Sequence, residues 1–265
     1  MAIGKLINWL TGKPKRTVIP EALWKDTVEN LPFLSCLDAG EKLRLRELAE
    51  RFLAEKEFTA AGGLELTDAV CVSIAIQGCL PILNLGLAYY RDWVGIVVYP
   101  DEFVIPRTVE DEFGVVHEYE DIASGEAWEG GPLLVSWHDA QMAGDGYNVV
   151  IHEFAHKLDM LNGEADGIPP LPADISWQEW ENELLAAYDD FCLQVDASEA
   201  GFSDDELFDA SQAIDPYASE NPGEFFAVLS ETFFEMPELL HREYPEFYAL
   251  FARFYRQDPR QRYSR

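Results

Sequence analysis

The stretch Tyr-Asn-Val-Val-Ile-His-Glu-Phe-Ala-His-Lys-Leu-Asp-Met-Leu, residues 147–161, decides the fold that this chain can form. Polar residues interrupt its apolar run on one face and Asn162-Gly163 follows as a helix stop, so we predict a helix over residues 147–161. On a helix His152 and His156 lie one turn apart on the same face, where both imidazoles can reach one ion at about 2.0–2.1 Å. Glu153 projects beside that face, where it can carry a proton from a water activated by the ion to the leaving amine of a peptide bond.

The alternative is a chance His-Glu-x-x-His pattern on an ordinary amphipathic helix. The chain has only five histidines, so two at this offset with Glu in the right gap are improbable. The apolar flanks at 149–151 and 154–155 predict a buried helix, and burying two imidazoles and a carboxylate is costly unless an ion or hydrogen bonds satisfy them. We therefore predict a metal site on this helix.

A catalytic zinc ion needs a third protein ligand and an open position for water. The extended pattern HExxHxxGxxH is not met, because Asp159 and Asn162 stand at the positions of its Gly and its last His. The third ligand must therefore come from another segment. Asp159 lies one turn after His156 and either orients an imidazole or ends the helix.

The best candidate for that ligand is Glu224, which lies near the start of a predicted helix over 222–235. A second explanation needs no metal, because Asn221 fits an N-cap, Pro222 the first helical position, and Glu224 the third residue of a capping box. Spacing favours Glu224 only slightly over Glu231 and Glu220. Glu231, on the same face seven residues later, could also accept a hydrogen bond from a ligand imidazole.

The rest of the chain predicts an α+β fold, mainly helical, with a small mixed β-sheet beside the HExxH helix. Helical periodicity covers residues 20–58 and 69–79, and later helices are predicted over 177–195, 222–235 and 244–255. Short β-branched and aromatic runs predict strands at 94–99, 103–105, 115–119 and 133–137. We expect a basic tail over residues 1–19 and one domain over 20–265, with a helical layer over 20–90 and the sheet and metal-binding helices over 91–265.

The composition excludes several function classes. Nineteen Lys and Arg against 49 Asp and Glu give a formal net charge of −30, and such a field repels nucleic-acid phosphates and anionic membrane surfaces. No run reaches the roughly 18 apolar residues of a membrane-spanning helix, and the N-terminus lacks the pattern of a secretory signal. The four cysteines show neither disulfide-framework nor metal-ligand spacing. We expect a cytoplasmic protein with no direct nucleic-acid or membrane partner.

Two segments carry a family resemblance: residues 146–159 around the histidines, and residues 214–231, Ile-Asp-Pro-Tyr-Ala-Ser-Glu-Asn-Pro-Gly-Glu-Phe-Phe-Ala-Val-Leu-Ser-Glu. With the terminal Phe-Tyr-Arg-Gln-Asp-Pro at 254–259, they resemble the Mlc titration factor A family of bacterial zinc metallopeptidases over nearly the whole chain. That family is similar in its catalytic core to the peptidase domain of anthrax lethal factor. The resemblance implies a zincin-like fold with a gluzincin-type site, in which His152, His156 and Glu224 hold one Zn²⁺ per chain and Glu153 is the general base.

The likeness to lethal factor also implies a role for Tyr217, which stands seven residues before Glu224. Its phenol would donate to the developing oxyanion; the alternative is a loop aromatic packed on the surface. The family implies aminopeptidase-like cleavage of short peptides and binding to the glucose-responsive transcriptional repressor Mlc. The competing hypothesis is a protein that chiefly sequesters the repressor, with a vestigial or structural metal site.

Two further expectations concern substrate access. An acidic loop over residues 189–209, longer than in the best-known family members, separates the two metal-binding helices. In peptidases of this general class an extended peptide lies antiparallel to an edge strand beside the HExxH helix. We expect residues 133–137 to form that strand.

Overall fold

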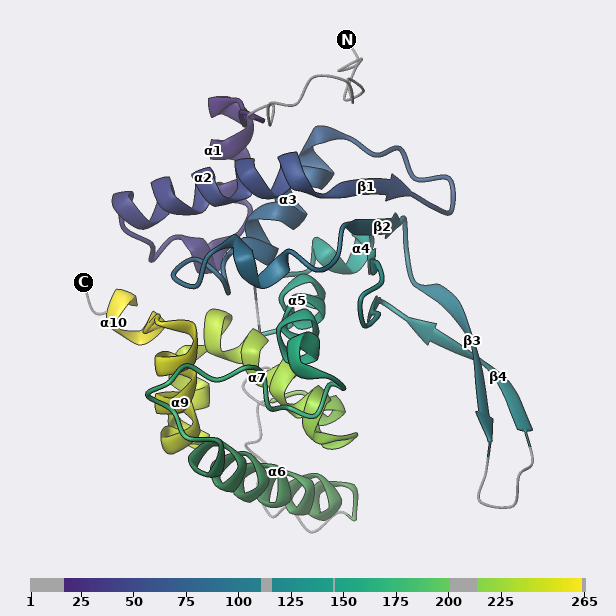
Figure 1. The fold of residues 1–265 in the computed structure, drawn as a ribbon, viewed down its shortest axis with the longest axis vertical. Coiled ribbons are helices and arrows are strands. Elements are labelled where there is room, and N and C mark those ends of the chain that lie inside the picture. The colour runs from purple at the N-terminus through teal and green to yellow at the C-terminus, as the bar shows by residue number, and fades with distance from the viewer. Residues whose placement is uncertain (1–16, 111–115, 145, 201–213, 264–265) are drawn as a thin grey trace.

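The structure is a computed structural model that describes residues 17–110, 116–144, 146–200 and 214–263. Helix α5 (Val149–Asp159) lies in the middle of the molecule, with the N-terminal helices on one side and the C-terminal helices on the other (Figure 1). Asn148 begins it, because the Asn148 side chain accepts a hydrogen bond from Ile151 N at 2.8 Å. A single 3-10 turn, η3 (Met160–Asn162), continues α5, so the helix predicted over 147–161 is confirmed.

Helices α1 (Glu21–Glu29), α2 (Ala39–Glu55) and α3 (Asp68–Cys79) form the N-terminal layer, with the short helices η1 (Pro32–Leu34) and η2 (Leu87–Tyr90) beside them. Asp38 and Glu41 build a capping box at the start of α2, with hydrogen bonds of 2.8 and 3.0 Å. Most of this layer follows the predicted helices.

The helical pattern expected to reach residue 58 ends earlier, at Glu55. Lys56 has an extended backbone, and strand β1 (Glu57–Ala60) follows. Its main chain pairs with strand β2 (Gly95–Tyr99), so partners distant in the sequence replace the next helical turn.

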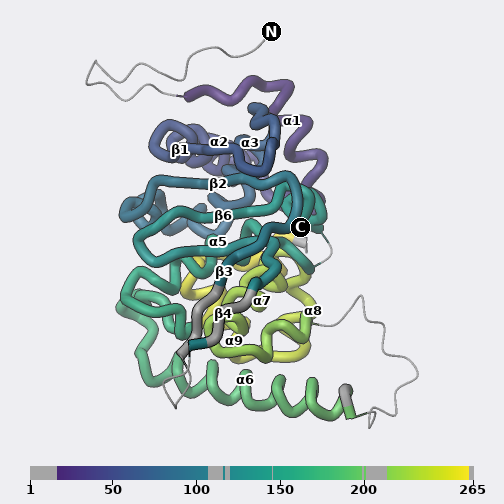
Figure 2. The backbone as a smooth tube through the Cα atoms, turned by 90° about the vertical axis from the view of Figure 1, so that its right-hand side faces the viewer, coloured from purple at the N-terminus to yellow at the C-terminus, as the bar shows by residue number. Residues whose placement is uncertain are grey.

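The main sheet has four strands in the order β1-β2-β6-β5. Strands β1, β2 and β6 (Leu133–Ser136) are parallel, and β5 (Gly125–Ala127) runs antiparallel to β6. Figure 2 shows β1, β2 and β6 side by side next to α5. Ile96 and Val98 of β2 and their partners Leu133 and Val135 are fully buried in the core, so the predicted small mixed sheet beside the HExxH helix is confirmed.

The prediction that residues 133–137 form the edge strand is wrong. Strand β6 lies between β2 and β5, so both of its edges are paired, and Trp137 begins the short helix α4 (Trp137–Ala140). The edge strands of the sheet are β1 and β5, and β5 is the one that contacts α5. Only three residues long and containing Gly125, β5 gives no alternating pattern for a sequence reading to detect.

Strands β3 (Phe103–Glu110) and β4 (Val116–Ala123) form a separate antiparallel sheet that extends from the body as an arm (Figure 1). The strands expected at 103–105 and 115–119 fall in this arm rather than in the main sheet. Phe103 and Ile105 are buried against Leu134 where the arm begins. They are apolar because they pack on the main sheet, although their strand does not belong to it.

The C-terminal layer contains α6 (Trp177–Glu199), η5 (Pro216–Ser219), α7 (Pro222–Glu235), α8 (Pro237–Glu243), α9 (Pro245–Tyr255) and α10 (Pro259–Tyr263). Proline stands at the first position of α7, α8 and α9, where its missing N–H leaves no helical hydrogen bond unmade. Trp180 of α6 stacks on Phe251 of α9 with ring centroids 5.8 Å apart, which holds α6 against the body.

The acidic loop expected over residues 189–209 is helical in its first part. Helix α6 continues to Glu199, because Phe191 is buried against Phe225 of α7, with ring centroids 5.7 Å apart. The loop from residue 201 onward and most of the expected basic tail lie outside the described residues.

One buried apolar cluster contains side chains from α1 through α9. Phe154 of α5 lies at its centre, 5.1 Å from Tyr90 and 5.6 Å from Trp93 between ring centroids. Within the described residues, no helix has the length and apolar character needed to cross a membrane. The domain boundaries given above stay a prediction.

Candidate metal centre

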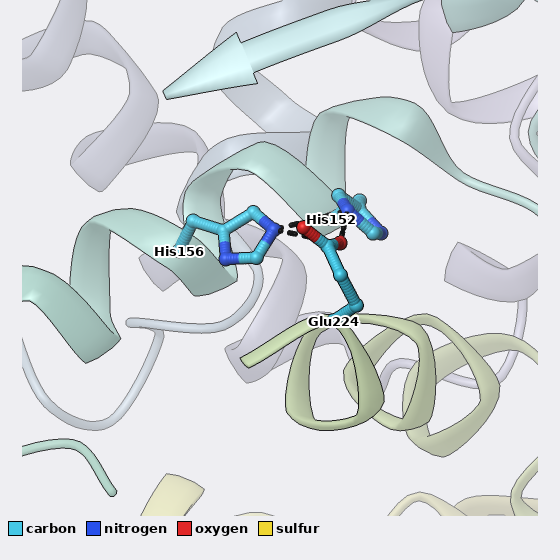
Figure 3. A group of neighbouring side chains, drawn as sticks. All are labelled: His152, His156 and Glu224. Atoms are coloured by element: carbon cyan, nitrogen blue, oxygen red, sulfur yellow. Dashed lines mark hydrogen bonds and ion pairs between the residues drawn. The ribbon is translucent and has the colours of Figure 1, made fainter. Parts of the chain in front are cut away.

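Two imidazoles from α5 and one carboxylate from α7 converge on a single point (Figure 3). Glu224 Oε2 lies 3.0 Å from His152 Nε2 and 3.1 Å from His156 Nε2, and the two Nε2 atoms are 3.1 Å apart. Helix α5 supplies the histidines because residues four apart share a face, and α7 supplies Glu224 because it packs along α5. The structure thus brings together the three residues that the family resemblance implied as ligands.

The hydrogen-bonding capacity of these atoms indicates a cation. Nδ1 of His152 lies 2.8 Å from Glu231 Oε1, and an ionised carboxylate can only accept, so Nδ1 carries hydrogen and the neutral form of the ring presents its lone pair at Nε2. That lone pair points toward the carboxylate oxygen of Glu224. Ligands at about 2.0–2.1 Å from a tetrahedral ion lie roughly 3.3 Å apart, close to the observed spacings, so the donor set fits zinc.

The carboxylates around this point favour positive charge there, whether it is a proton on an imidazole or a cation. Burial opposes charge on Glu224, but hydrogen bonds from His152 and His156 hold its pKa well below its usual range. Burial also opposes charge on His152, yet its hydrogen bonds to Glu224 and Glu231 raise the pKa of the imidazole well above its ordinary value. The pocket of carboxylates therefore stabilises positive charge where these side chains meet.

Glu231 is buried on α7, about two turns after Glu224, and lies next to Nδ1 of the His152 ring. Its Oε1 accepts from His152 Nδ1, and its Oε2 accepts from Asn148 N at the start of α5. The sequence spacing suggested such a bond to a ligand imidazole, and the geometry agrees with it. Burial raises the pKa of Glu231, although its hydrogen bond with His152 acts to lower it. Glu231 thus sets the tautomer and the orientation of the His152 ring.

Glu235, one turn further along α7, holds the loop that leads into α5. Its Oε2 accepts from Gly144 N at 3.0 Å and from Gly146 N at 2.9 Å, and its Oε1 accepts from Asn148 Nδ2 at 2.8 Å. Burial raises the pKa of Glu235 to about 7, although the hydrogen bond from Asn148 favours the ionised form. The acidic face of α7 therefore binds both a ligand histidine and the preceding loop.

Within the described part of the chain, Asp159 makes no direct hydrogen bond to an imidazole. It is the last residue of α5, and its Oδ2 accepts from Gly167 N at 2.7 Å. Its Oδ1 and Nδ1 of His156 are both buried without a hydrogen-bond partner among the described residues. Of the two roles left open for Asp159, ending the helix and anchoring the next loop matches its contacts.

The capping role weighed against Glu224 turns out to coexist with its position among the ligands. Asn221 begins α7 and its side chain accepts from the backbone N of Glu224 at 3.0 Å. The Glu224 carboxylate does not return that bond and points to the histidines instead. The backbone N–H of Glu224 therefore takes part in the helix cap, while its carboxylate takes part in the site.

Glu153 lies beside the three converging side chains, and with them it lines a cavity of about 310 Å³. The other lining residues come from β5, from the segment after α5, from η5 and from the N-cap of α7: Gly125, Glu126, Ala127, Met160, Ala165, Tyr217 and Asn221. Glu153 is 5% exposed, and its Oε2 has no hydrogen-bond partner within the described part of the chain. Burial raises the pKa of Glu153 to about 8, so its affinity for a proton is far above that of an ordinary carboxylate.

Tyr217 lies on η5 at the mouth of this cavity. Its ring centroid is 6.1 Å from that of His152, and 52% of the residue is exposed. Partial burial and the neighbouring carboxylates Glu224 and Glu153 raise the pKa of its phenol, so the hydroxyl keeps its proton. The structure places Tyr217 near the site, as the resemblance implied.

Lys157, next to the second histidine, connects α5 to the hairpin that carries β5. Its buried ammonium donates to the carbonyls of Trp128, Gly131 and Pro132 at 2.5, 2.9 and 3.4 Å. Burial lowers the pKa of Lys157 to about 8. The turn between β5 and β6 is therefore fixed to the helix that bears the histidines.

Sequence reasoning missed several of these residues. Glu231 follows Glu224 by seven residues and Glu235 follows Glu231 by four, all on one face of α7, and that spacing could have identified Glu235. Lys157 had no such signal, because its three acceptors are main-chain carbonyls. The lining strand β5 could not be recognised from three residues.

Comparison with known proteins agrees with this geometry. The chain matches the family described as glucose-regulated metallo-peptidase M90 over residues 6–256. It is 40% identical over 261 residues to Mlc titration factor A of Salmonella arizonae, covering 97% of this chain and 99% of that protein. The proteins of the same name from Salmonella schwarzengrund and Salmonella typhi are 39% identical over 261 residues, covering 97% of this chain and 94% of each relative. These matches confirm the resemblance carried by residues 146–159 and 214–231.

Proposed function

Since the chain belongs to the glucose-regulated metallo-peptidase family M90, we propose that it is a zinc-dependent peptidase whose ligands are His152, His156 and Glu224. The observation that carries the proposal is the convergence of these three side chains within hydrogen-bond distance beside a cavity that Glu153 also lines. Two histidines and a glutamate leave a fourth position open, which is typical of catalytic rather than structural zinc.

In this proposal Glu153 is the general base. A zinc ion held by the three ligands would polarise the substrate carbonyl and lower the pKa of a water toward about 7. Glu153 lines the cavity and is buried, so its carboxylate can take a proton there and later release it to the leaving amine. Its raised pKa brings it close to neutral pH, which suits a group that must do both.

Tyr217 and strand β5 would hold the substrate. The Tyr217 phenol, kept protonated by burial and by nearby carboxylates, can donate to the carbonyl oxygen as charge develops on it. Strand β5 pairs with β6 only among the described strands, so its outer edge can accept an extended peptide through main-chain hydrogen bonds. We propose short peptides as substrates and aminopeptidase-like cleavage as the mode.

The test measures zinc content and hydrolysis of unblocked and blocked amino-acid anilides by the wild type and by Glu153→Gln. Glutamine keeps the volume of Glu153 but cannot accept a proton, so zinc should remain while turnover falls about 10²- to 10⁴-fold. A preference for unblocked anilides would support aminopeptidase-like cleavage. Equal turnover by wild type and variant would remove Glu153 from the mechanism.

A second candidate function is favoured by the names of the relatives, Mlc titration factor A. We propose that this chain also binds the repressor Mlc, in the cytoplasm, and its net charge of −30 suits docking onto a basic face of a DNA-binding protein. Titration calorimetry of the purified chain against Mlc tests this. Binding that survives Glu153→Gln, in a chain whose wild type hydrolyses no peptide, would favour sequestration over catalysis.

A further inference from the structure

The backbone of strand β5 comes unusually close to the Glu153 side chain. A Cβ atom built on Gly125 would lie 2.3 Å from Glu153 Oε1, 2.6 Å from its Cγ and 2.7 Å from its Cδ. These distances are well inside van der Waals contact, so the carboxylate of Glu153 occupies the space in which any other residue at 125 would carry its side chain.

The backbone itself does not require glycine at this position. Gly125 is absent from the glycines with positive φ, and it pairs with Val135 in the antiparallel ladder of β5 and β6. Glycine inside a strand weakens the strand and is found where another group approaches closely. The approaching group here is Glu153.

Glu153 also differs from the other carboxylates of the site in how it is held. Glu224, Glu231 and Glu235 are all fixed by hydrogen bonds to side chains or backbone. Glu153 Oε2 has no hydrogen-bond partner among the described residues, so packing against its neighbours helps to fix its position. The nearest backbone in that packing is Gly125.

We infer that Gly125 is a positioning residue: the missing side chain at 125 seats the Glu153 carboxylate at the wall of the cavity. This inference rests on the proposed role of Glu153 as general base. It adds a residue of β5 that touches neither metal nor leaving group and still decides where the proton acceptor lies.

A second glycine offers a matched comparison on the opposite side of α5. A Cβ atom on Gly78 of α3 would lie 2.4–2.7 Å from the ring of Phe154, the residue after Glu153. Phe154 is fully buried, so its ring has no room to yield. The flexible carboxylate of Glu153, in contrast, can turn away from a methyl group at 125.

The experiment compares Gly125→Ala with the wild type, and its first measurement is a crystal structure of each. We expect the Glu153 carboxylate to be displaced in the variant, with little change in thermal stability and full zinc content. Turnover should fall about 100-fold, as expected for a misplaced reacting group, with KM nearly unchanged. An unmoved carboxylate, or undiminished turnover in an active enzyme, would overturn the inference.

Two control variants distinguish the specific contact between residue 125 and Glu153 from a general effect of adding a methyl group to the core. Gly78→Ala should lower stability while leaving turnover of the folded fraction near that of the wild type. Should Gly78→Ala fail to fold, Gly95→Ala on β2 adds a methyl group to the same sheet, 3.3 Å from Pro132 Cβ and away from Glu153. An equal loss of turnover in a folded control would show that contact at 125 is not specific, and would overturn the inference.

A double variant gives an independent readout. Glu153→Asp shortens the side chain and makes room for a methyl group at 125, so Gly125→Ala should cost much less activity in that background than in the wild type. Additive losses would contradict direct contact. If the wild type hydrolyses no peptide, the proposed function would fail. A displaced Glu153 carboxylate in the Gly125→Ala crystal would still support Gly125 as the residue that positions it.

Discussion

The wall of the cavity formed by α7 and the wall formed by β5 hold their carboxylates by different means. On α7, Glu231 and Glu235 accept hydrogen bonds from His152, from Asn148 and from the backbone of the loop before α5. Against β5, Glu153 packs on Gly125, and its buried Oε2 has no hydrogen-bond partner among the described residues. The carboxylates of α7 are held by hydrogen bonds, whereas the group proposed to gain and lose a proton is held in part by packing.

The largest expected effect comes from removing the α7 carboxylate that meets both histidines. Glu224→Ala should reduce zinc affinity by more than about 100-fold, beyond the usual effect of residues that only support a ligand. Metal analysis after dialysis against a chelator of known affinity measures this. Glu220→Ala, an exposed glutamate just before the same helix, is the control and should keep its zinc. Zinc retained by Glu224→Ala would mean that another carboxylate is the ligand.

The second effect is a pH dependence of the protein's free energy of unfolding that arises from the titration of Glu235. Because burial raises its pKa from 4.5 to about 7, the folded protein keeps a proton in this window that the unfolded chain has lost. Stability therefore falls as pH rises from about 4.5 to about 7, by up to about 3 kcal/mol. Urea unfolding of the wild type and of Glu235→Gln, both with EDTA, measures the difference.

That difference isolates Glu235 because the other titrating groups are shared by both proteins. The stability of the wild type should fall relative to Glu235→Gln between roughly pH 4 and pH 8. Parallel curves for the two proteins would show that the three N–H donors keep Glu235 ionised throughout.

The third effect is smaller and tests how the α7 wall supports its ligand. Glu231→Ala frees the His152 ring and its tautomer, so zinc affinity should fall about 10- to 100-fold while the ion can still be bound. Competition with a fluorescent zinc chelator gives the constant. If Glu231→Ala loses more affinity than Glu224→Ala, the assignment of ligand and support must be reversed.

The smallest effect concerns Tyr217, which belongs to neither wall and is 52% exposed. Tyr217→Phe should lower turnover about 10-fold, less than the 10²- to 10³-fold loss typical of a buried oxyanion donor. Zinc content and stability should not change. A variant as active as the wild type would leave Tyr217 as a surface aromatic, the alternative set against its catalytic role.

The sequence predicted the α7 side of the site better than the β5 side, and the reason is physical. A helix repeats its face every three to four residues, so His152 and His156 could be placed from spacing, which put Glu224 and Glu231 on one face but favoured Glu224 as the ligand only slightly. The cap at Asn221 and the ligand position of Glu224 looked like alternatives because a sequence does not separate a residue's backbone from its side chain. The structure uses both.

The β5 side depends on contacts that no local pattern encodes. Strand β5 is too short to alternate, and its neighbour β6 looked like an edge because one of its partners, β2, is far away in the sequence and the other, β5, was not recognised. The strand β1 was hidden for the same reason at the end of a helical run. Gly125 carries no signal until the position of Glu153 is known.

The ammonium of Lys157 joins the hairpin of β5 and β6 to helix α5. It follows His156 directly on α5, and it donates to carbonyls of the turn that connects β5 to β6. Consequently one helical turn carries a candidate ligand and also clamps the hairpin against which a peptide would lie. These hydrogen bonds couple the hairpin to the helix, so a peptide laid along β5 would keep its distance from the side chains proposed to act on it.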